Sequence, residues 1–354
     1  MAWGRDQREN DVTARSAHLV GSLPGDSAED AMGLALDRLG PLLRSLPDGE
    51  TGDRRNWIIS IIESFRGHPD LELEHDGDWS DYDAIPRFRV RKGHRLLGVS
   101  LDFGHVQAAT ASLPVFELLR SKGQYEDLSF QVGVPGDFDM AMFTLGPVAA
   151  LRQQRAFTEA TLAEVRRVHA LTEGQAVFQI EIPAELVLLA KAPGPAQPAM
   201  ARVLGRRIAA LAAGAAPGTR FGIHLCLGDM NHRALGRMAD ATPLVLLSNA
   251  IAKAWPQDRR LEFVHAPFAA ADDPPPVEGS FYAPLYRLAL PYGTRFIAGI
   301  AHEDQTIEQQ RQIRSVIDRA VGRPVALSHA CGLGRREPDA ARAALDRLAE
   351  LCLD

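Results

Sequence analysis

The chain has 354 residues, of which 46% are hydrophobic and 24% are charged, a composition typical of a globular protein with a sizeable core. Its formal net charge of −6 provides no basic footprint for nucleic acid, so we expect no nucleic-acid partner. The three cysteines are too few for a disulfide scaffold, and we expect them to be reduced thiols.

The N-terminal stretch MAWGRDQRENDVTARS is polar and lacks the apolar core of a signal peptide. No apolar stretch of the sequence reaches the roughly 18 residues that would span a bilayer. We therefore expect residues 1–15 to form a flexible tail, the protein to be cytoplasmic, and no membrane partner.

The chain then alternates short apolar runs with longer stretches of helical periodicity. A first strand and its loop are predicted in residues 16–24, SAHLVGSLP, followed by a helix in residues 26–43. The end of a second strand is predicted in residues 44–53, RSLPDGETGD, and another helix in residues 56–65.

A hairpin excursion is predicted at about residues 70–95, where the sequence is polar, rich in turn formers and then alternating. Six further strands follow, most of them separated by helical stretches such as residues 157–172 and 308–322. These strands are predicted at residues 128–137, 176–185, 220–229, 261–268, 295–304 and 324–334.

Regular alternation of strands and helices is typical of a parallel sheet with helices outside it. Eight such units favour a closed (β/α)₈ TIM barrel with loop and hairpin insertions, formed by residues 16–354 as a single domain. A doubly wound open sheet is the alternative. The Gly-x-Gly-x-x-Gly pattern of dinucleotide binding and the Gly-x-x-x-x-Gly-Lys pattern of phosphate loops are both missing.

Reactive side chains collect at the predicted carboxyl ends of the strands, which is where barrel enzymes place their active sites. A barrel would bring these side chains from distant parts of the sequence to one mouth. They are Ser22, Glu50, Asp137, Glu181, His224, Cys226, His265, His302, His329 and Cys331.

His224 and Cys226 lie two positions apart on a predicted strand, so their side chains point to the same face. Imidazole and thiolate are good zinc ligands, and Cys331, in a glycine-rich exit loop, would be a third. A catalytic zinc site keeps its fourth position open or weakly held, and zinc lowers the pKa of a bound thiol. The alternative is that His224 and Cys226 are ordinary core residues, because free cysteine is often buried.

These motifs resemble the catalytic half of cobalamin-independent methionine synthase, in the barrel superfamily that also holds uroporphyrinogen decarboxylase. The likeness covers nearly the whole chain and is weakest at residues 70–95. It includes the His-x-Cys strand end, the Cys-Gly-Leu that follows the last strand, and the stretches VGSLP, DGETGD, TLGPVAAL and QIEIPAE. The resemblance implies that His224, Cys226 and Cys331 bind Zn²⁺.

The resemblance also implies roles for residues that would contact the substrate. Ser22 would meet a substrate carboxylate, and Glu50 would face its amine. Glu181 stands at the first acid of the family's Asp-Glu pair, so it is a candidate for both substrate binding and catalysis. His302, in GIAHED, stands where the family places a histidine that works as an acid.

The sequence also departs from the family pattern. Ile182 replaces the second acid of the Asp-Glu pair, which weakens the case for homocysteine as the thiol. His265 stands nearest the position of the family's glutamate zinc ligand, so it is the leading candidate for the fourth ligand, with Asp229 as a rival. We expect no N-terminal duplicate barrel such as the full-length folate enzyme has, and the resemblance implies that relatives without it can take methyl groups from other donors, including corrinoids.

We therefore expect a zinc-dependent transferase that activates a small-molecule thiol for transfer of a methyl or alkyl group from a donor. An alternative is zinc-dependent thiol addition to another electrophile, as in epoxyalkane:coenzyme M transferase, which resembles this chain in its zinc ligands. Two others are a zinc-free lyase or decarboxylase of the same superfamily, and a non-catalytic binding protein. An oligomer is compatible with the sequence, and residues 70–95 are expected to influence substrate choice.

Overall fold

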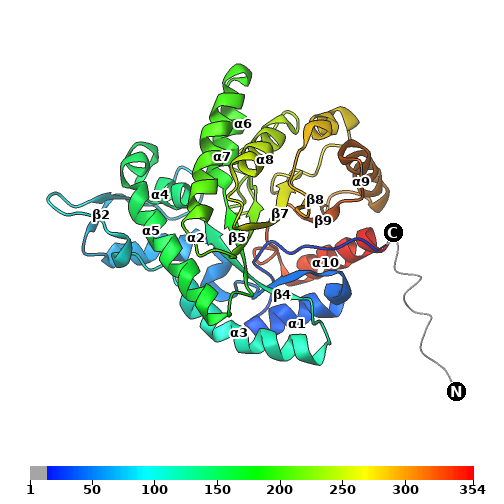
Figure 1. The fold of residues 1–354 in the computed structure, drawn as a ribbon, viewed down its shortest axis with the longest axis horizontal. Helices are drawn as coiled ribbons and strands as arrows, with labels where there is room; N and C mark the ends of the chain where they lie inside the picture. Colours follow the sequence, from blue (N-terminus) through cyan, green and yellow to red (C-terminus); the bar gives the residue numbers. More distant parts are fainter. Residues whose placement is uncertain (1–13) are drawn as a thin grey trace.

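A computed structural model describes residues 14–354, and its centre is a curled, seven-stranded parallel sheet surrounded by helices (Figure 1). The order of strands in the sheet is their order along the chain, with a separate hairpin inserted after the first strand. The strands are β1 (Ser45–Pro47), β4 (Ser129–Pro135), β5 (Val177–Glu181), β6 (Arg220–His224), β7 (Arg260–Pro267), β8 (Arg295–Ala301) and β9 (Ala326–His329).

The segment before the first helix links the two edges of this sheet. Ala17 makes isolated parallel bridges to Leu43, beside β1, and to Leu327 in β9. Because one residue reaches both edges, the sheet is strongly curled and its edge strands are not open to solvent along that contact. The six strands predicted after residue 95 are all present, whereas residues 16–24 contribute only these bridges and no longer strand.

Side-chain amides explain why the segment around Ala17 pairs with its neighbouring strands at only one residue. The Gln131 amide donates to the carbonyl oxygens of Leu19 and Val20 at 2.8 and 3.0 Å. The Gln179 amide also donates to Val20 O, at 2.6 Å. Backbone groups that a longer strand would pair with its neighbours are thus satisfied by side chains inside the sheet.

Helices cover the outer side of the sheet, and two of them begin at well-formed caps. The Ser27 hydroxyl accepts from the backbone N–H of Asp30 at the first helix, and Thr306 forms a capping box with Gln309 at the ninth. The helices are α1 (Ala28–Leu39), α2 (Ile58–Ser64), α3 (His105–Lys122), α4 (Asp137–Leu145), α5 (Pro147–Leu171), α6 (Pro183–Lys191), α7 (Gln197–Ala213), α8 (Thr242–Ala254), α9 (Ile307–Val321) and α10 (Pro338–Leu353).

The stretch in which a hairpin is predicted contains strands β2 (Leu71–His75) and β3 (Arg87–Val90), which pair antiparallel and apart from the main sheet. Figure 1 shows this hairpin at the periphery of the molecule. Leu71 and Phe88 anchor it in a second apolar cluster, which also contains residues of α2, α4 and α5. This packing fixes the connection between β2 and β3 beside the carboxyl ends of the main strands.

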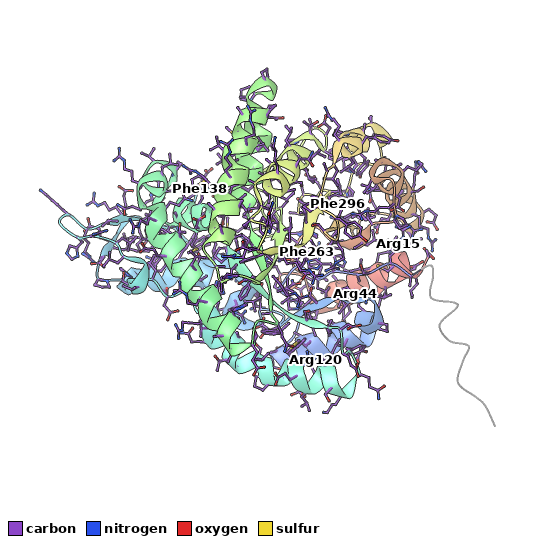
Figure 2. All side chains as sticks on the ribbon, viewed as in Figure 1. Arg15, Arg44, Arg120, Phe138, Phe263 and Phe296 are labelled. Carbon is purple, nitrogen blue, oxygen red and sulfur yellow. The ribbon has the colours of Figure 1, made fainter. Side chains whose placement is uncertain are left out.

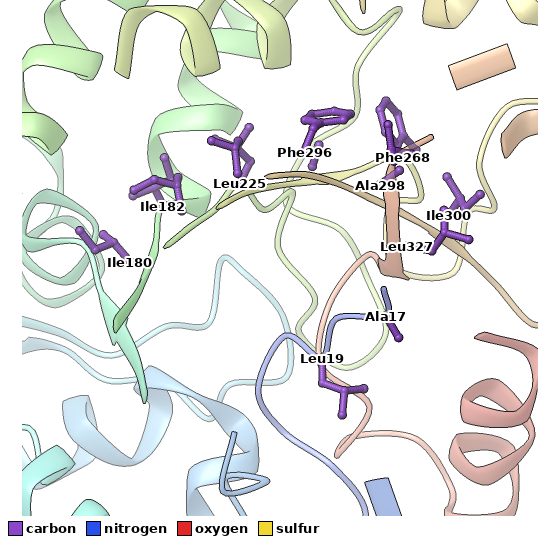
Figure 3. Packing of buried hydrophobic residues seen from close by; sticks show 14 of the residues in the cluster. Ala17, Leu19, Ile180, Ile182, Leu225, Phe268, Phe296, Ala298, Ile300 and Leu327 are labelled. Atoms are coloured by element: carbon purple, nitrogen blue, oxygen red, sulfur yellow. The ribbon is translucent and has the colours of Figure 1, made fainter. Parts of the chain in front are cut away.

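The two faces of the sheet differ in polarity. Phe263 of β7 and Phe296 of β8, both labelled in Figure 2, belong to different apolar clusters. Phe296 belongs to the main apolar cluster under the helices, part of which appears in Figure 3. Phe263 points inward, where its ring packs on His18 with centroids 4.6 Å apart. The interior of the curled sheet is therefore partly polar. Buried hydrogen bonds, such as that between His18 and Gln179 (3.0 Å), satisfy its polar side chains.

The predicted tail lies almost wholly outside the described residues. Its last residue, Arg15, forms an ion pair with Asp318 at 2.8 Å, and its backbone N–H donates to Cys352 O. Within residues 14–354, no helix combines the length and apolarity that crossing a bilayer would require.

Candidate metal and substrate site

A cavity of about 470 Å³ opens where the main strands end. It collects residues from the first segment, from β5 and β6, and from the loop after β9, together with residues of α2, α4 and the hairpin. The lining includes Ser22, Glu50, Trp57, Trp79, Tyr82, Phe143, Glu181, His224, Cys226, Asp229, Cys331 and Arg335.

Three of the predicted metal ligands meet in this cavity. One nitrogen of His224 and the sulfurs of Cys226 and Cys331 all lie within 4.8 Å of one another. The two sulfurs are 3.9 Å apart, although 105 positions separate them in the sequence. His224 ends β6, and the chain stays paired just beyond it because Leu225 N–H donates to His265 O in β7. The extended backbone thus carries both side chains of the His-x-Cys pair into the cavity.

The glycines after Cys331 allow the loop that follows β9 to approach the first segment. Ser22 O accepts from Leu333 N–H at 2.7 Å, and Ser22 Oγ accepts from Gly334 N–H at 3.3 Å. A side chain at position 332 would collide with the Ser22 hydroxyl. Glycine at 332 is therefore required for this close approach, which holds Cys331 beside the predicted substrate-binding serine.

Arg335 and Asp229 surround the sulfur of Cys331. The Arg335 Nη2 donates to Cys331 Sγ at 3.2 Å and to Asp229 Oδ2 at 3.1 Å. The hydrogen bond from Cys226 and the Arg335 charge hold the pKa of the Cys331 thiol well below its ordinary value. The same contact and burial raise the pKa of Cys226. Without a metal, the pair therefore favours a thiolate at Cys331 and a thiol at Cys226.

His265 lies behind His224 and outside the group of three. Its Nε2 is 2.9 Å from His329 O, and its Nδ1 is 2.7 Å from His224 Nδ1. Both ring nitrogens are thus engaged, and burial holds the pKa of His265 well below its ordinary value. The structure does not bring His265 forward as the fourth ligand. The Asp229 side chain is 4% exposed, lines the cavity and has an Oδ1 with no hydrogen-bond partner.

Glu50 and Glu181 both line the cavity, where Glu181 is buried and Glu50 is half-buried. Gln179 donates to Glu181 Oε1 at 3.0 Å. Burial raises the pKa of Glu50 to about 7, and burial together with the Glu50 carboxylate raises the pKa of Glu181 well above its ordinary value. Glu50 also has a left-handed backbone, with φ of 43°, which is costly for a residue other than glycine. The pair favours a bound proton or a cationic ligand.

His302 is placed outside this cavity. Its Nε2 is 3.0 Å from Ala271 O, and its Nδ1 accepts from Asp304 N–H at 3.2 Å. The ring ties the loop after β8 to the loop after β7, with both nitrogens bonded to backbone. The structure therefore does not bring the predicted acid into contact with the other site residues.

An aromatic roof, defined as Trp57, Trp79, Tyr82 and Phe143, covers the outer part of the cavity and is missed by sequence reasoning. Tyr82 lies in the connection between β2 and β3, accepts from Met230 N–H at 3.1 Å and donates to the backbone of the same loop. This connection thus bridges to the loop after β6. Arg335 is also missed, since a basic stretch predicts a solvated loop and its contact with Cys331 depends on the fold.

Comparison with known proteins supports the resemblance at the level of structure. Neither a family model nor a curated protein sequence matches the chain. The B12-independent methionine synthase of a Shewanella species, in complex with selenomethionine, matches with a TM-score of 0.58 and 15% identity, over 96% of this chain and 97% of that one. A methyltransferase from Methanosarcina mazei matches with a TM-score of 0.54 and 11% identity, over 96% and 94%. The chain thus shares its fold with these two proteins.

Proposed function

We propose that the protein is a zinc-dependent transferase that activates a small-molecule thiol for methyl or alkyl transfer. The observation that carries this proposal is the meeting of His224, Cys226 and Cys331 in one cavity. The fold, shared with a methionine synthase and a methyltransferase, supports methyl transfer as the reaction class.

We further infer that the curled sheet closes as the (β/α)₈ barrel that the sequence predicts, with the segment around Ala17 as its eighth strand. The two parallel bridges of Ala17 support this closure. Sites at the carboxyl ends of barrel strands are built from loops of several units, and the candidate cavity has that composition.

The three residues fit a zinc ion by their chemistry and spacing. In a tetrahedral site with zinc–sulfur bonds of about 2.3 Å, two sulfurs lie about 3.8 Å apart, close to the 3.9 Å between Cys226 and Cys331. His224 Nε2 is buried and has no hydrogen-bond partner, so this nitrogen is available to a metal ion. Bound zinc would lower the pKa of a substrate thiol, so that the thiolate forms near neutral pH.

The remaining side chains of the cavity would bind and orient the substrate. Glu50 and Glu181 form an acidic end for an ammonium group, and Ser22 would contact a carboxylate, which together favour a thiol of amino-acid character. Arg335 compensates the charge on Cys331. If the protein supplies a fourth metal ligand, Asp229 is better placed than His265, because its Oδ1 is free and it lines the cavity.

The outer part of the cavity favours an alkyl donor with an apolar body. The aromatic roof and neighbouring isoleucines line it, and among the described lining residues the only cationic side chain is Arg335. That guanidinium is already bonded to Asp229 and Cys331. A polyanionic donor would find little compensating charge there, whereas a neutral or cationic one would not need it.

Metal analysis tests the proposal directly. The wild-type protein, purified without chelator, is expected to carry about one zinc ion, and Cys331→Ser is expected to lose it. Cys352→Ser is the matched control, because Cys352 is buried in α10 away from the cavity. Full zinc retention in Cys331→Ser, with the fold verified by circular dichroism, would contradict the proposal. Transfer of a methyl group to a thiol by the zinc-loaded protein would then establish the reaction.

A further inference from the structure

Two successive hydrogen bonds run through the interior of the curled sheet to His224. The His329 carbonyl oxygen lies 2.9 Å from His265 Nε2. His265 Nδ1 lies 2.7 Å from His224 Nδ1. The far nitrogen, His224 Nε2, is buried and has no partner. The chain of contacts therefore begins on a backbone atom and ends at the candidate metal site.

The chemistry of these groups fixes where the protons lie. A carbonyl oxygen only accepts, so His265 Nε2 carries a proton. His265 is fully buried, and neither of its ring partners is an anion, so the ring is neutral and its Nδ1 is a bare acceptor. His224 Nδ1 must then donate to it. In the Nδ1–H tautomer the lone pair of the ring is on Nε2, which has no hydrogen-bond partner among the described residues.

We propose that His265 is a positioning residue that holds His224 in the Nδ1–H tautomer and so presents Nε2 to the metal. The metal part of this inference rests on the proposed function, whereas the tautomer is a property of the metal-free protein. The arrangement is the one that a metal-ligating histidine needs, in which the nitrogen away from the metal donates to a fixed acceptor. His265 thus acts through His224 rather than as a ligand itself.

A glycine on the neighbouring strand leaves the space that this arrangement needs. A Cβ atom at Gly299, in β8, would lie 2.8 Å from His329 O and 3.0 Å from His265 Nε2. Both are closer than side-chain carbons normally come, and the two atoms are the two ends of the first hydrogen bond. Any larger residue at position 299 would push that bond apart.

The test compares three substitutions of His265, two of which each keep one of its two hydrogen bonds. His265→Asn places an acceptor oxygen near the position of Nδ1, whereas His265→Gln places a donor near Nε2, and His265→Leu removes both. The zinc dissociation constant is measured by competition with a chromophoric chelator. We expect a 10- to 100-fold weakening for the Leu and Gln variants and a change of only a few-fold for Asn. His68→Leu is the matched control, because His68 is another buried histidine with two backbone contacts, set in the hairpin region.

Nitrogen-15 NMR of the histidine rings in metal-free protein measures the tautomer of His224 directly. A substitution of His265 that only weakened the packing would leave this tautomer unchanged. The wild type is expected to show His224 as the Nδ1–H tautomer, and His265→Gln a mixture of tautomers. The inference is overturned if His224 is Nε2–H in the wild type, or if folded His265→Gln binds zinc as tightly as the Asn variant. If the wild type binds no zinc, the proposed function fails, and the NMR result still decides the tautomer. Should His265→Leu not fold, the Asn and Gln variants carry the comparison.

Discussion

Glu50 and Glu181 bring their carboxyl groups against the same residue of β4, Gly133, inside the cavity. A Cβ atom at Gly133 would lie 2.8 Å from Glu50 Oε1 and 2.9 Å from Glu181 Oε1. Glu50 follows β1 and Glu181 ends β5, so the two acids come from the ends of different strands. Their proximity sets the charge that a substrate meets at the inner end of the cavity.

This arrangement predicts a pH-dependent stability of the metal-free protein. The pKa of Glu50 rises from 4.5 to about 7 on folding, because the folded protein favours the protonated carboxyl group. The contribution of this group to the free energy of unfolding is therefore fully present below pH 4.5 and is lost as the pH rises through 7. The difference corresponds to about 3 kcal/mol in the free energy of unfolding. Urea denaturation at pH 5 and pH 8 should show a smaller loss for Glu50→Gln than for the wild type. An equal loss in both proteins would show that Glu50 is not responsible.

The buried pair of Arg335 and Asp229 predicts a strong coupling in stability. Removing one partner leaves the other charge buried, so Arg335→Met or Asp229→Asn should each lower the free energy of unfolding by about 3 kcal/mol. The double variant should lose clearly less than the sum of the two. A double-mutant cycle from chemical denaturation measures this coupling, and strict additivity would mean that the ion pair contributes nothing to the fold.

Arg335 should also control the reactivity of Cys331. Its Nη2 donates to that sulfur, so Arg335→Met is expected to slow alkylation of Cys331 in metal-free protein at pH 7 by about tenfold. Mass spectrometry of iodoacetamide-labelled peptides separates Cys331 from Cys226 and measures the rate. An unchanged rate would assign the low pKa of Cys331 to its other neighbours.

The aromatic roof should affect substrate binding without affecting the metal. Trp79→Ala is expected to raise the KM for the alkyl donor by about tenfold or more, because a large part of the apolar wall is lost. Zinc content should not change. Leu73→Ala is the control on the same hairpin, since Leu73 is 40% exposed and does not line the cavity. Equal effects of both changes would assign the result to the hairpin as a whole.

The close approach of Gly332 to Ser22 offers a test by compensation. Gly332→Ala should displace the loop that carries Cys331 and weaken zinc binding by about tenfold, because its Cβ would meet the Ser22 hydroxyl. Adding Ser22→Gly removes that hydroxyl and should restore part of the affinity. Isothermal titration with zinc compares the three proteins, and no recovery in the double variant would contradict the steric explanation.

The sequence alone predicts much of this architecture because its signals are local. β5, β6, β8 and the antiparallel hairpin follow from periodicity and flanking turns, and the meeting of His224, Cys226 and Cys331 follows once strand ends share one mouth. The short pairing at Ala17 could not be predicted, since it depends on distant glutamine side chains.

Other parts of the site depend on contacts that have no local signal. The burial of Arg335 arises from a sulfur and a carboxylate on separate loops. His265 looks like a ligand by its place in the sequence, and only the position of His329 O shows both of its nitrogens to be engaged. The aromatic roof likewise depends on how an irregular connection lies over the loop after β6.

The contact of the first segment with β9 has a consequence for folding on the ribosome. His18 O accepts from the Ser328 hydroxyl at 2.9 Å, and 310 positions separate the two residues. The segment around His18 therefore gains this neighbour in the sheet only after the 310 positions that separate it from Ser328 have been synthesised. Contacts of such long sequence separation form slowly, so the nascent chain exposes an incomplete sheet edge until β9 has been made.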